Sequence, residues 1–95
     1  MDRRLTVSSA YGQAGLRREL ERLAQAQNGT RNDQLNKAAF SLGQLVGSGA
    51  LDEDGTAAAL IQAGQDLGLG LNECERTVAS GITAGMEQPR GLNIG

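Results

Sequence analysis

Apolar residues recur three and four positions apart in four segments of this chain, at about 9–27, 30–46, 52–67 and 72–88. This spacing places them on one face of a helix. The four apolar stripes are Leu16, Leu20, Leu23 and Ala24; Leu35, Ala38, Ala39, Leu42, Leu45 and Val46; Ala57, Leu60, Ile61, Gly64 and Leu67; and Cys74, Val78, Ile82 and Met86. No segment sustains the alternation of a strand, so the pattern predicts an all-α fold, a compact bundle of about four short helices.

Residues typical of helix ends flank these segments. We expect Ser9, Thr30, Asp52 and Asn72 to be the four N-caps, because their side chains can accept hydrogen bonds from the free amides of a first turn. Thr30 with Asp33, and Asn72 with Glu75, also have the spacing of a capping box. The expected stops are Asn28-Gly29, Gly47-Ser48-Gly49, Gly68 and Pro89.

Four glycines fall inside the helical patterns, at positions 43, 64, 81 and 85. Each costs about 1 kcal/mol of helix stability relative to alanine. A repeated cost of this kind indicates close approach of two backbones, with Gly81 and Gly85 one turn apart on the fourth helix. The alternative is that these glycines leave room for the phosphate or base of a ligand.

The chain has 95 residues, of which 39% are hydrophobic, which suits one small domain with a single core. We expect residues 9–90 to form that domain, with a flexible N-terminus at 1–8 and a frayed C-terminus at 91–95.

The composition excludes several kinds of site. With no histidine and one cysteine, Cys74, the chain holds no Ser-His-Asp or Cys-His set, no structural zinc site and no internal disulfide. Asp52, Glu53 and Asp54 suit a helix N-terminus better than a calcium loop. We therefore expect no metal, no cofactor and no catalytic activity, and the lone cysteine favours a reducing, cytoplasmic location.

A membrane-spanning segment and a secretory signal are also not expected. The longest apolar run, residues 57–61, is far short of the roughly 20 residues that span a bilayer. The first eight residues lack the apolar stretch of a secretory signal.

Charge is unevenly distributed along the chain, whose net charge is −2. Residues 1–37 hold seven basic and four acidic residues, whereas 38–95 hold two basic and seven acidic. A polyanion would therefore meet the first third of the chain. The alternative is that Arg17, Arg18 and Arg22 solvate the first helix and pair with Glu19 and Glu21, with Arg17 and Glu21 four residues apart.

The start of the second helix is the first candidate site. Free amides of a first turn attract anions, and Arg31 and Lys37 add positive charge. Asn32, Asn36 and Phe40 are spaced by four, so we expect two amides and a stacking surface on one face. The alternative is that Asn32 caps the helix, Asn36 bonds a neighbouring loop and Phe40 belongs to the core.

The end of the fourth helix is the second candidate site. Ser80 lies among small residues, where its hydroxyl can meet a ligand, and Arg90 follows the helix C-terminus. The alternative role of Arg90 is to complement the negative end of the helix dipole or to pair with Glu87.

Read in order, a set of residues between positions 10 and 90 resembles the small helical domain of bifunctional DNA primase-polymerases from actinobacterial phages and plasmids. The residues that carry the resemblance are Tyr11; Gly29-Thr30-Arg31-Asn32; Leu35-Asn36-Lys37-Ala38-Ala39-Phe40; Leu42-Gly43; Gly49; Gly68-Leu69; Glu75; Ser80-Gly81; Gly85; and Pro89-Arg90. In that family the domain follows the catalytic domain and is often followed by a helicase.

The resemblance implies a non-catalytic accessory domain that binds single-stranded template DNA, a nucleotide, or both during primer synthesis. Its partners would be a primase catalytic domain or a helicase domain, in the same chain or another. We expect Arg31 and Lys37 to contact phosphate, Asn32 and Asn36 to contact base or sugar, and Ser80 and Arg90 to approach from the fourth helix. The competing hypothesis is a module that binds a protein partner through exposed apolar surface between the helices, as the small-residue face of the fourth helix and the acidic balance of residues 38–95 suggest.

Overall fold

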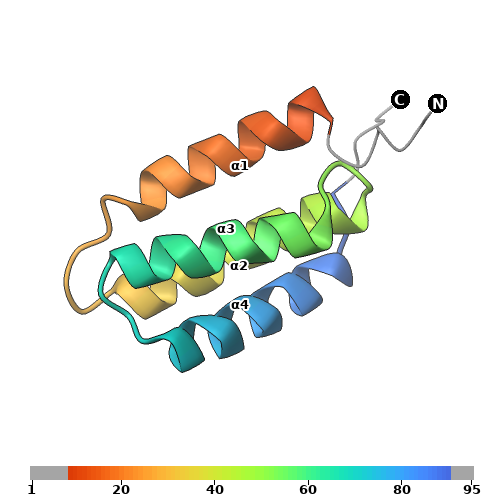
Figure 1. The fold of residues 1–95 in the computed structure, drawn as a ribbon. Helices are drawn as coiled ribbons and strands as arrows, with labels where there is room; N and C mark the ends of the chain where they lie inside the picture. Colours follow the sequence, from red (N-terminus) through yellow and green to blue (C-terminus); the bar gives the residue numbers. More distant parts are fainter. Residues whose placement is uncertain (1–8, 91–95) are drawn as a thin grey trace.

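The computed structural model describes residues 9–90, so the predictions for 1–8 and 91–95 lie outside it. Its four helices are α1 (Ala10–Leu23), α2 (Arg31–Gly47), α3 (Glu53–Asp66) and α4 (Leu71–Met86) (Figure 1). Residues 9–90 contain no strand. The predicted all-α bundle is confirmed.

The helix α2 lies at the centre of the bundle. It runs along α4 over most of its length, and α3 packs on both α2 and α4. The helix α1 packs less extensively on the rest of the bundle and stands furthest from α4 (Figure 1). The core is made of leucine, alanine, valine, isoleucine and the Cys74 thiol, and Leu35, Leu42 and Leu60 have no exposed surface.

The helices α2 and α4 are in backbone contact, as their glycines predicted. A Cβ atom at Gly43 would lie 2.5 Å from the carbonyl oxygen of Ile82, and one at Gly81 would lie 2.6 Å from the Ala39 Cβ. A Cβ at Gly85 would overlap the carbonyl oxygen of Phe40. Only glycine permits this approach. The space beside these glycines is therefore largely filled by the neighbouring helix rather than left for a ligand.

The face through which α1 packs coincides only in part with the predicted stripe, since Leu23 is in the core and Leu16 and Leu20 pack against its edge. Gly12, Gly15 and Leu23 are buried, whereas Leu16 and Leu20 of the predicted stripe are half-buried and Ala24 is exposed. A Cβ at Gly15 would lie 2.7 Å from Leu45 Cδ1, so the glycine side brings α1 near α2. Leu20 and Ala24 of the stripe are turned toward α3.

The first helix also ends before the predicted Gln27. The amides of Gln25 and Ala26 donate to the carbonyls of Arg22 and Leu23, three residues back, at 3.1 and 3.0 Å. Such bonds tighten the last turn and close the helix. Gly29, at φ +89°, then takes the left-handed conformation that was expected of it.

Two of the four predicted caps form. The Ser9 hydroxyl accepts from the Gly12 amide at 2.9 Å, and the Asp52 carboxylate accepts from the Gly55 amide at 2.6 Å. Thr30 precedes α2 but makes no capping bond, because its hydroxyl donates to the Gln27 carbonyl at 2.8 Å. The capping box predicted with Asp33 is therefore wrong.

The cap predicted at Asn72 is also wrong. The helix α4 begins at Leu71, with Gly70 as N-cap, so Asn72 lies inside the first turn. The cause is the tight end of α3, where the Leu69 amide donates to the Gly64 carbonyl at 3.0 Å. Gly70 follows in an extended conformation, and its carbonyl accepts from the Cys74 amide at 2.9 Å, which is the first hydrogen bond of α4.

No helix within residues 9–90 has the length and apolar character needed to cross a membrane.

Candidate functional site

A shallow open hollow lies between α2 and α4, and it unites four of the residues that the sequence singled out. Its lining residues are Asn36, Lys37 and Phe40 from α2 and Ser80, Gly81 and Ala84 from α4. We call this surface the α2–α4 hollow. It forms because α2 and α4 touch at Gly81, where a larger side chain would displace one helix. Residues more than forty positions apart in the sequence thus share one surface.

Phe40 lines this hollow rather than the core. Its side chain is half-buried, between the two roles that the sequence allowed. Phe40 is anchored by the contact of its own backbone with Gly85, which holds this turn of α2 against α4. The exposed part of the ring is an apolar surface beside the amide of Asn36 and the hydroxyl of Ser80, both of which are exposed.

Lys37 supplies the positive charge of the hollow. Its ammonium lies 3.2 Å from Asp33 Oδ2, and the two side chains are 68% and 63% exposed. An ion pair this exposed has little net stability, so a stronger anion can replace the carboxylate. Lys37 is therefore available to a phosphate group at the edge of the hollow.

Asn32 is held by α4 instead of facing a ligand. Its Nδ2 donates to Glu73 Oε2 at 2.9 Å and to Thr77 Oγ1 at 2.8 Å. These bonds use both amide hydrogens, and the Glu73 carboxylate opposes an anion at this place. The structure makes Asn32 a link between the first turns of α2 and α4.

Arg31 lies on another side of α2 from Lys37. Six residues separate them, which is about 240° around a helix. The Arg31 side chain is half-buried near the turn from α3 to α4, where its Nη1 would lie 3.8 Å from a Cβ placed at Gly68. Its buried Nε has no hydrogen-bond partner within residues 9–90. Arg31 therefore does not join the α2–α4 hollow.

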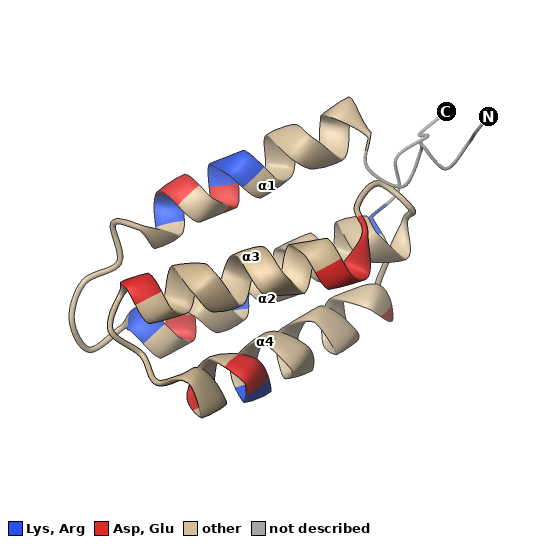
Figure 2. Cartoon of the chain, viewed as in Figure 1, with Lys and Arg blue, Asp and Glu red and all other residues tan. Residues whose placement is uncertain are grey.

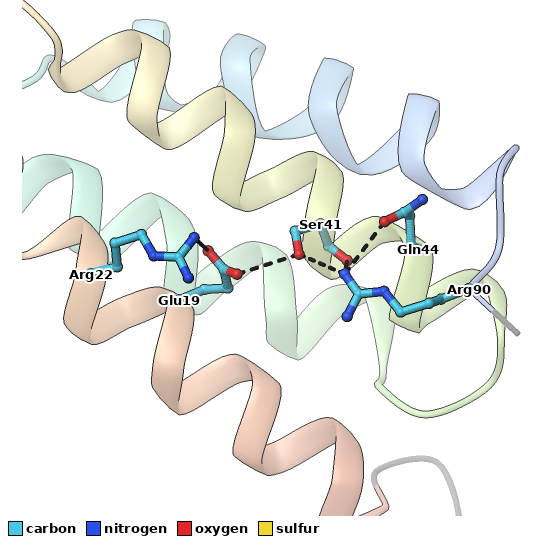
Figure 3. Close-up of polar contacts among 5 residues, drawn as sticks. All are labelled: Glu19, Arg22, Ser41, Gln44 and Arg90. Carbon is cyan, nitrogen blue, oxygen red and sulfur yellow. Dashed lines mark hydrogen bonds and ion pairs between the residues drawn. The ribbon is translucent and has the colours of Figure 1, made fainter. Parts of the chain in front are cut away.

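Arg90 is hydrogen-bonded to the C-terminal half of α2 (Figure 3). Its Nη2 donates to the hydroxyl of Ser41 at 2.7 Å, to the carbonyl of Ser41 at 3.2 Å and to Gln44 Oε1 at 3.3 Å. These bonds all use Nη2 of the guanidinium, and within residues 9–90 Arg90 forms no ion pair with Glu87. Arg90 fastens the chain that follows α4 onto α2.

The same contact continues to α1. The Ser41 hydroxyl donates to Glu19 Oε2 at 3.3 Å, and Glu19 Oε1 lies 3.6 Å from Arg22 Nη1 (Figure 3). Glu19 thus pairs with Arg22, whereas the expected pair of Arg17 with Glu21 is not formed. Ser41 was not among the predicted site residues, although it is a polar residue beside the apolar stripe of α2.

A second, more apolar hollow lies between α1 and α3. Its lining includes Leu20, Ala24, Ala59, Ala63 and Leu67. We call it the α1–α3 hollow. It results from the rotation of α1, which leaves part of the predicted stripe uncovered. By contrast, Gly81 and Gly85 of α4 are covered by α2, whereas Ser80 and Ala84 beside them are exposed.

Neither hollow has the composition of a metal centre. Within residues 9–90, no three His, Cys, Asp or Glu side chains come together as potential metal ligands.

No family model, curated protein or solved structure matches this chain. The resemblance to the helical domain of primase-polymerases therefore stays a prediction made from the residues.

Proposed function

We propose that this chain is a non-catalytic accessory domain of a DNA primase-polymerase or a related replication protein, and that it binds single-stranded template DNA or a nucleotide through the α2–α4 hollow. The observation that carries the proposal is the placement of Phe40, Asn36, Lys37 and Ser80 on one surface. It is supported by the resemblance, whose Asn-Lys-Ala-Ala-Phe and Ser-Gly motifs meet in this hollow.

The chemistry of the hollow suits one nucleotide unit. A base can stack on the exposed part of the Phe40 ring, which is tolerant of sequence because every base has a π-face. Asn36 offers a donor and an acceptor to the base edge or sugar. Lys37 and Ser80 can contact the phosphate, Lys37 as a point charge and Ser80 as a hydroxyl donor.

A quantitative binding experiment tests this function. Fluorescently labelled oligothymidylate is titrated with the full chain at low salt, and the same titration is run with Phe40→Leu and Lys37→Gln. Base–aromatic stacking is worth about 1–3 kcal/mol, so Phe40→Leu should weaken binding about tenfold. The Leu side chain keeps the packing against α4, and circular dichroism checks that the fold persists. Binding that is equal in the parent and in both variants would sink the proposal.

The opposite change provides a matched control. Asp33→Asn removes the carboxylate that pairs with Lys37 without altering side-chain size. On this proposal the substitution should tighten oligonucleotide binding, because the phosphate no longer has to displace the Asp33 carboxylate from Lys37. A variant that binds more weakly than the parent would argue against a phosphate at Lys37.

A second candidate function is a protein-interaction module, which the α1–α3 hollow favours. Its apolar lining includes Leu20 and Leu67, both half-buried in this structure. Burial of such surface drives protein association. The two functions are separated by Leu20→Ser, which should leave oligonucleotide binding unchanged if the α2–α4 hollow is the site.

A further inference from the structure

The α2–α4 hollow does not end at Lys37. Lys37 also lines a cleft between α1 and α2, together with Arg22, Gln34 and Ser41. Arg22 and Gln34 in turn line a wider depression beside the turn between these helices, which Arg18 reaches. The first two hollows share Lys37, and the second and third share Arg22 and Gln34, so the three are neighbours on the surface. We call the part from Lys37 to Arg18 the α1–α2 seam.

Positive charges follow one another along this seam. Lys37, Arg22 and Arg18 lie in that order, and Arg18 and Arg22 are one turn apart on α1, or about 6 Å. Their flank of α1 faces α2, whereas Arg17 is on the opposite flank beside Leu16 and Leu20. The seam therefore collects cations from two helices, which the sequence alone did not predict.

The carboxylates at the seam leave these cations accessible. Glu19 is only 14% exposed and is already held by the Ser41 hydroxyl and Arg22. Arg22 itself is 66% exposed, so its guanidinium has free donors on the solvent side. Glu21 borders the seam beside Arg18, and Asp33 pairs with Lys37, so three carboxylates offset the three cations and leave the seam without net charge. We expect binding here to be weak and strongly dependent on salt.

The helix α3 carries the opposite charge. It contains Glu53, Asp54 and Asp66 and no basic residue, and Asp52 caps it. In Figure 2 these acidic positions mark the two ends of α3, whereas the blue positions of α1 gather toward its C-terminal half. A polyanion is therefore directed away from α3 and toward the seam.

We propose that the α1–α2 seam continues the α2–α4 hollow as a track for single-stranded DNA. A base stacks on Phe40, and the phosphates of the following nucleotides lie against Lys37, Arg22 and Arg18. This inference rests on the proposed function and makes it more specific, because the ligand becomes a strand of several nucleotides rather than one free nucleotide. Three elements of the bundle, α1, α2 and α4, then share one ligand.

The test compares two probes, dAMP and an octamer of thymidylate, on the full chain. The double variant Arg18→Gln/Arg22→Gln should weaken octamer binding tenfold or more and leave dAMP binding unchanged. Because this variant removes two cations that bind phosphate, the slope of log affinity against log salt should become shallower by about 1.4. Arg17→Gln is the matched control, since it removes one positive charge from the same helix on the opposite flank, and it should change octamer binding at most slightly.

The outcomes separate the track from the proposed function. If Phe40→Leu weakens both probes but the double variant binds the octamer like the parent, the hollow stands and the track is refuted. If Arg17→Gln weakens octamer binding as much per charge removed as the double variant does, the octamer is attracted by positive charge anywhere on α1. The track is then also refuted. If the parent binds neither probe, both proposals fall.

Discussion

Cys74 illustrates how strongly one residue is controlled by its surroundings. The thiol has no exposed surface and lies against the backbone of Gly64, where a Cβ would come within 2.7 Å of its sulfur. Burial raises the pKa of this thiol above 9.0, and the carboxylates of Glu73 and Glu75 raise it further. Cys74 is therefore a packing residue that stays protonated in the folded chain, not a nucleophile.

We predict that Cys74 is unreactive in the folded chain. At pH 8 an aromatic disulfide reagent should modify it only as fast as the protein opens, and immediately in denaturant. A native-state rate equal to that in denaturant would contradict its burial.

The raised pKa also has a consequence for stability. Because the folded pKa exceeds the unfolded one, the contribution of the thiol is complete below pH 9.0 and is lost as the pH rises through the folded value. The free energy of unfolding should therefore fall above pH 9.0 more steeply in the parent than in Cys74→Ala. Parallel pH profiles from denaturant titrations would argue against this coupling.

The sequence predicted which residues belong to the candidate site better than it predicted the surface on which each side chain lies. Asn36 and Phe40 share a surface as their spacing predicted, and Ser80 from the second candidate site lies beside them. Asn32 does not join them because Glu73 and Thr77 of α4 bind its amide, and Arg31 does not because it lies on another side of α2, near Gly68. Arg90 binds Ser41 and Gln44, which lie in α2, far from Arg90 in the sequence. These partners could be identified only from the fold.

At the scale of elements, the contact between α2 and α4 organises the site. The glycines at positions 43, 81 and 85 set the separation of the two helices, and the hollow lies beside them. The sequence predicted a close approach of α4 to a neighbouring helix, because repeated glycines destabilise a helix without such a contact, but it did not identify α2 as that neighbour. It did not predict the packing of α1, because Gly12 and Gly15 show no apolar stripe although they are part of its buried face.

Alanine substitutions distinguish two kinds of contact in this pair. At Gly81 the added methyl meets mainly the Ala39 methyl, whereas at Gly85 it meets the backbone of Phe40 and Gln44. We expect each substitution to destabilise the fold by about 1–3 kcal/mol. Ala39→Gly should partly rescue Gly81→Ala in a double-mutant cycle and should not rescue Gly85→Ala.

Thermal or denaturant unfolding of these variants measures the energies. Additive effects of Gly81→Ala and Ala39→Gly, with no coupling energy, would show that the two positions are not in contact.

At the scale of the whole molecule, the net charge hides an uneven distribution of charged residues over the fold. A net charge of −2 argues against a nucleic-acid binder, yet four of the eleven acidic residues belong to α3 and its cap, and Arg18, Arg22 and Lys37 meet at the seam. The imbalance along the sequence pointed to the first third of the chain. In the fold, this first third of the chain forms α1 and α2, which line the seam, and α4 adds the other wall of the α2–α4 hollow.

The most direct test of the central claim is a map of the binding surface. The full chain, labelled with ¹⁵N, is titrated with octathymidylate at low salt, and the amide shifts are followed by NMR. We expect the largest changes at Asn36, Lys37, Phe40 and Ser80, with smaller ones along the seam. Absence of any change at millimolar ligand, or changes confined to the α1–α3 hollow, would contradict it.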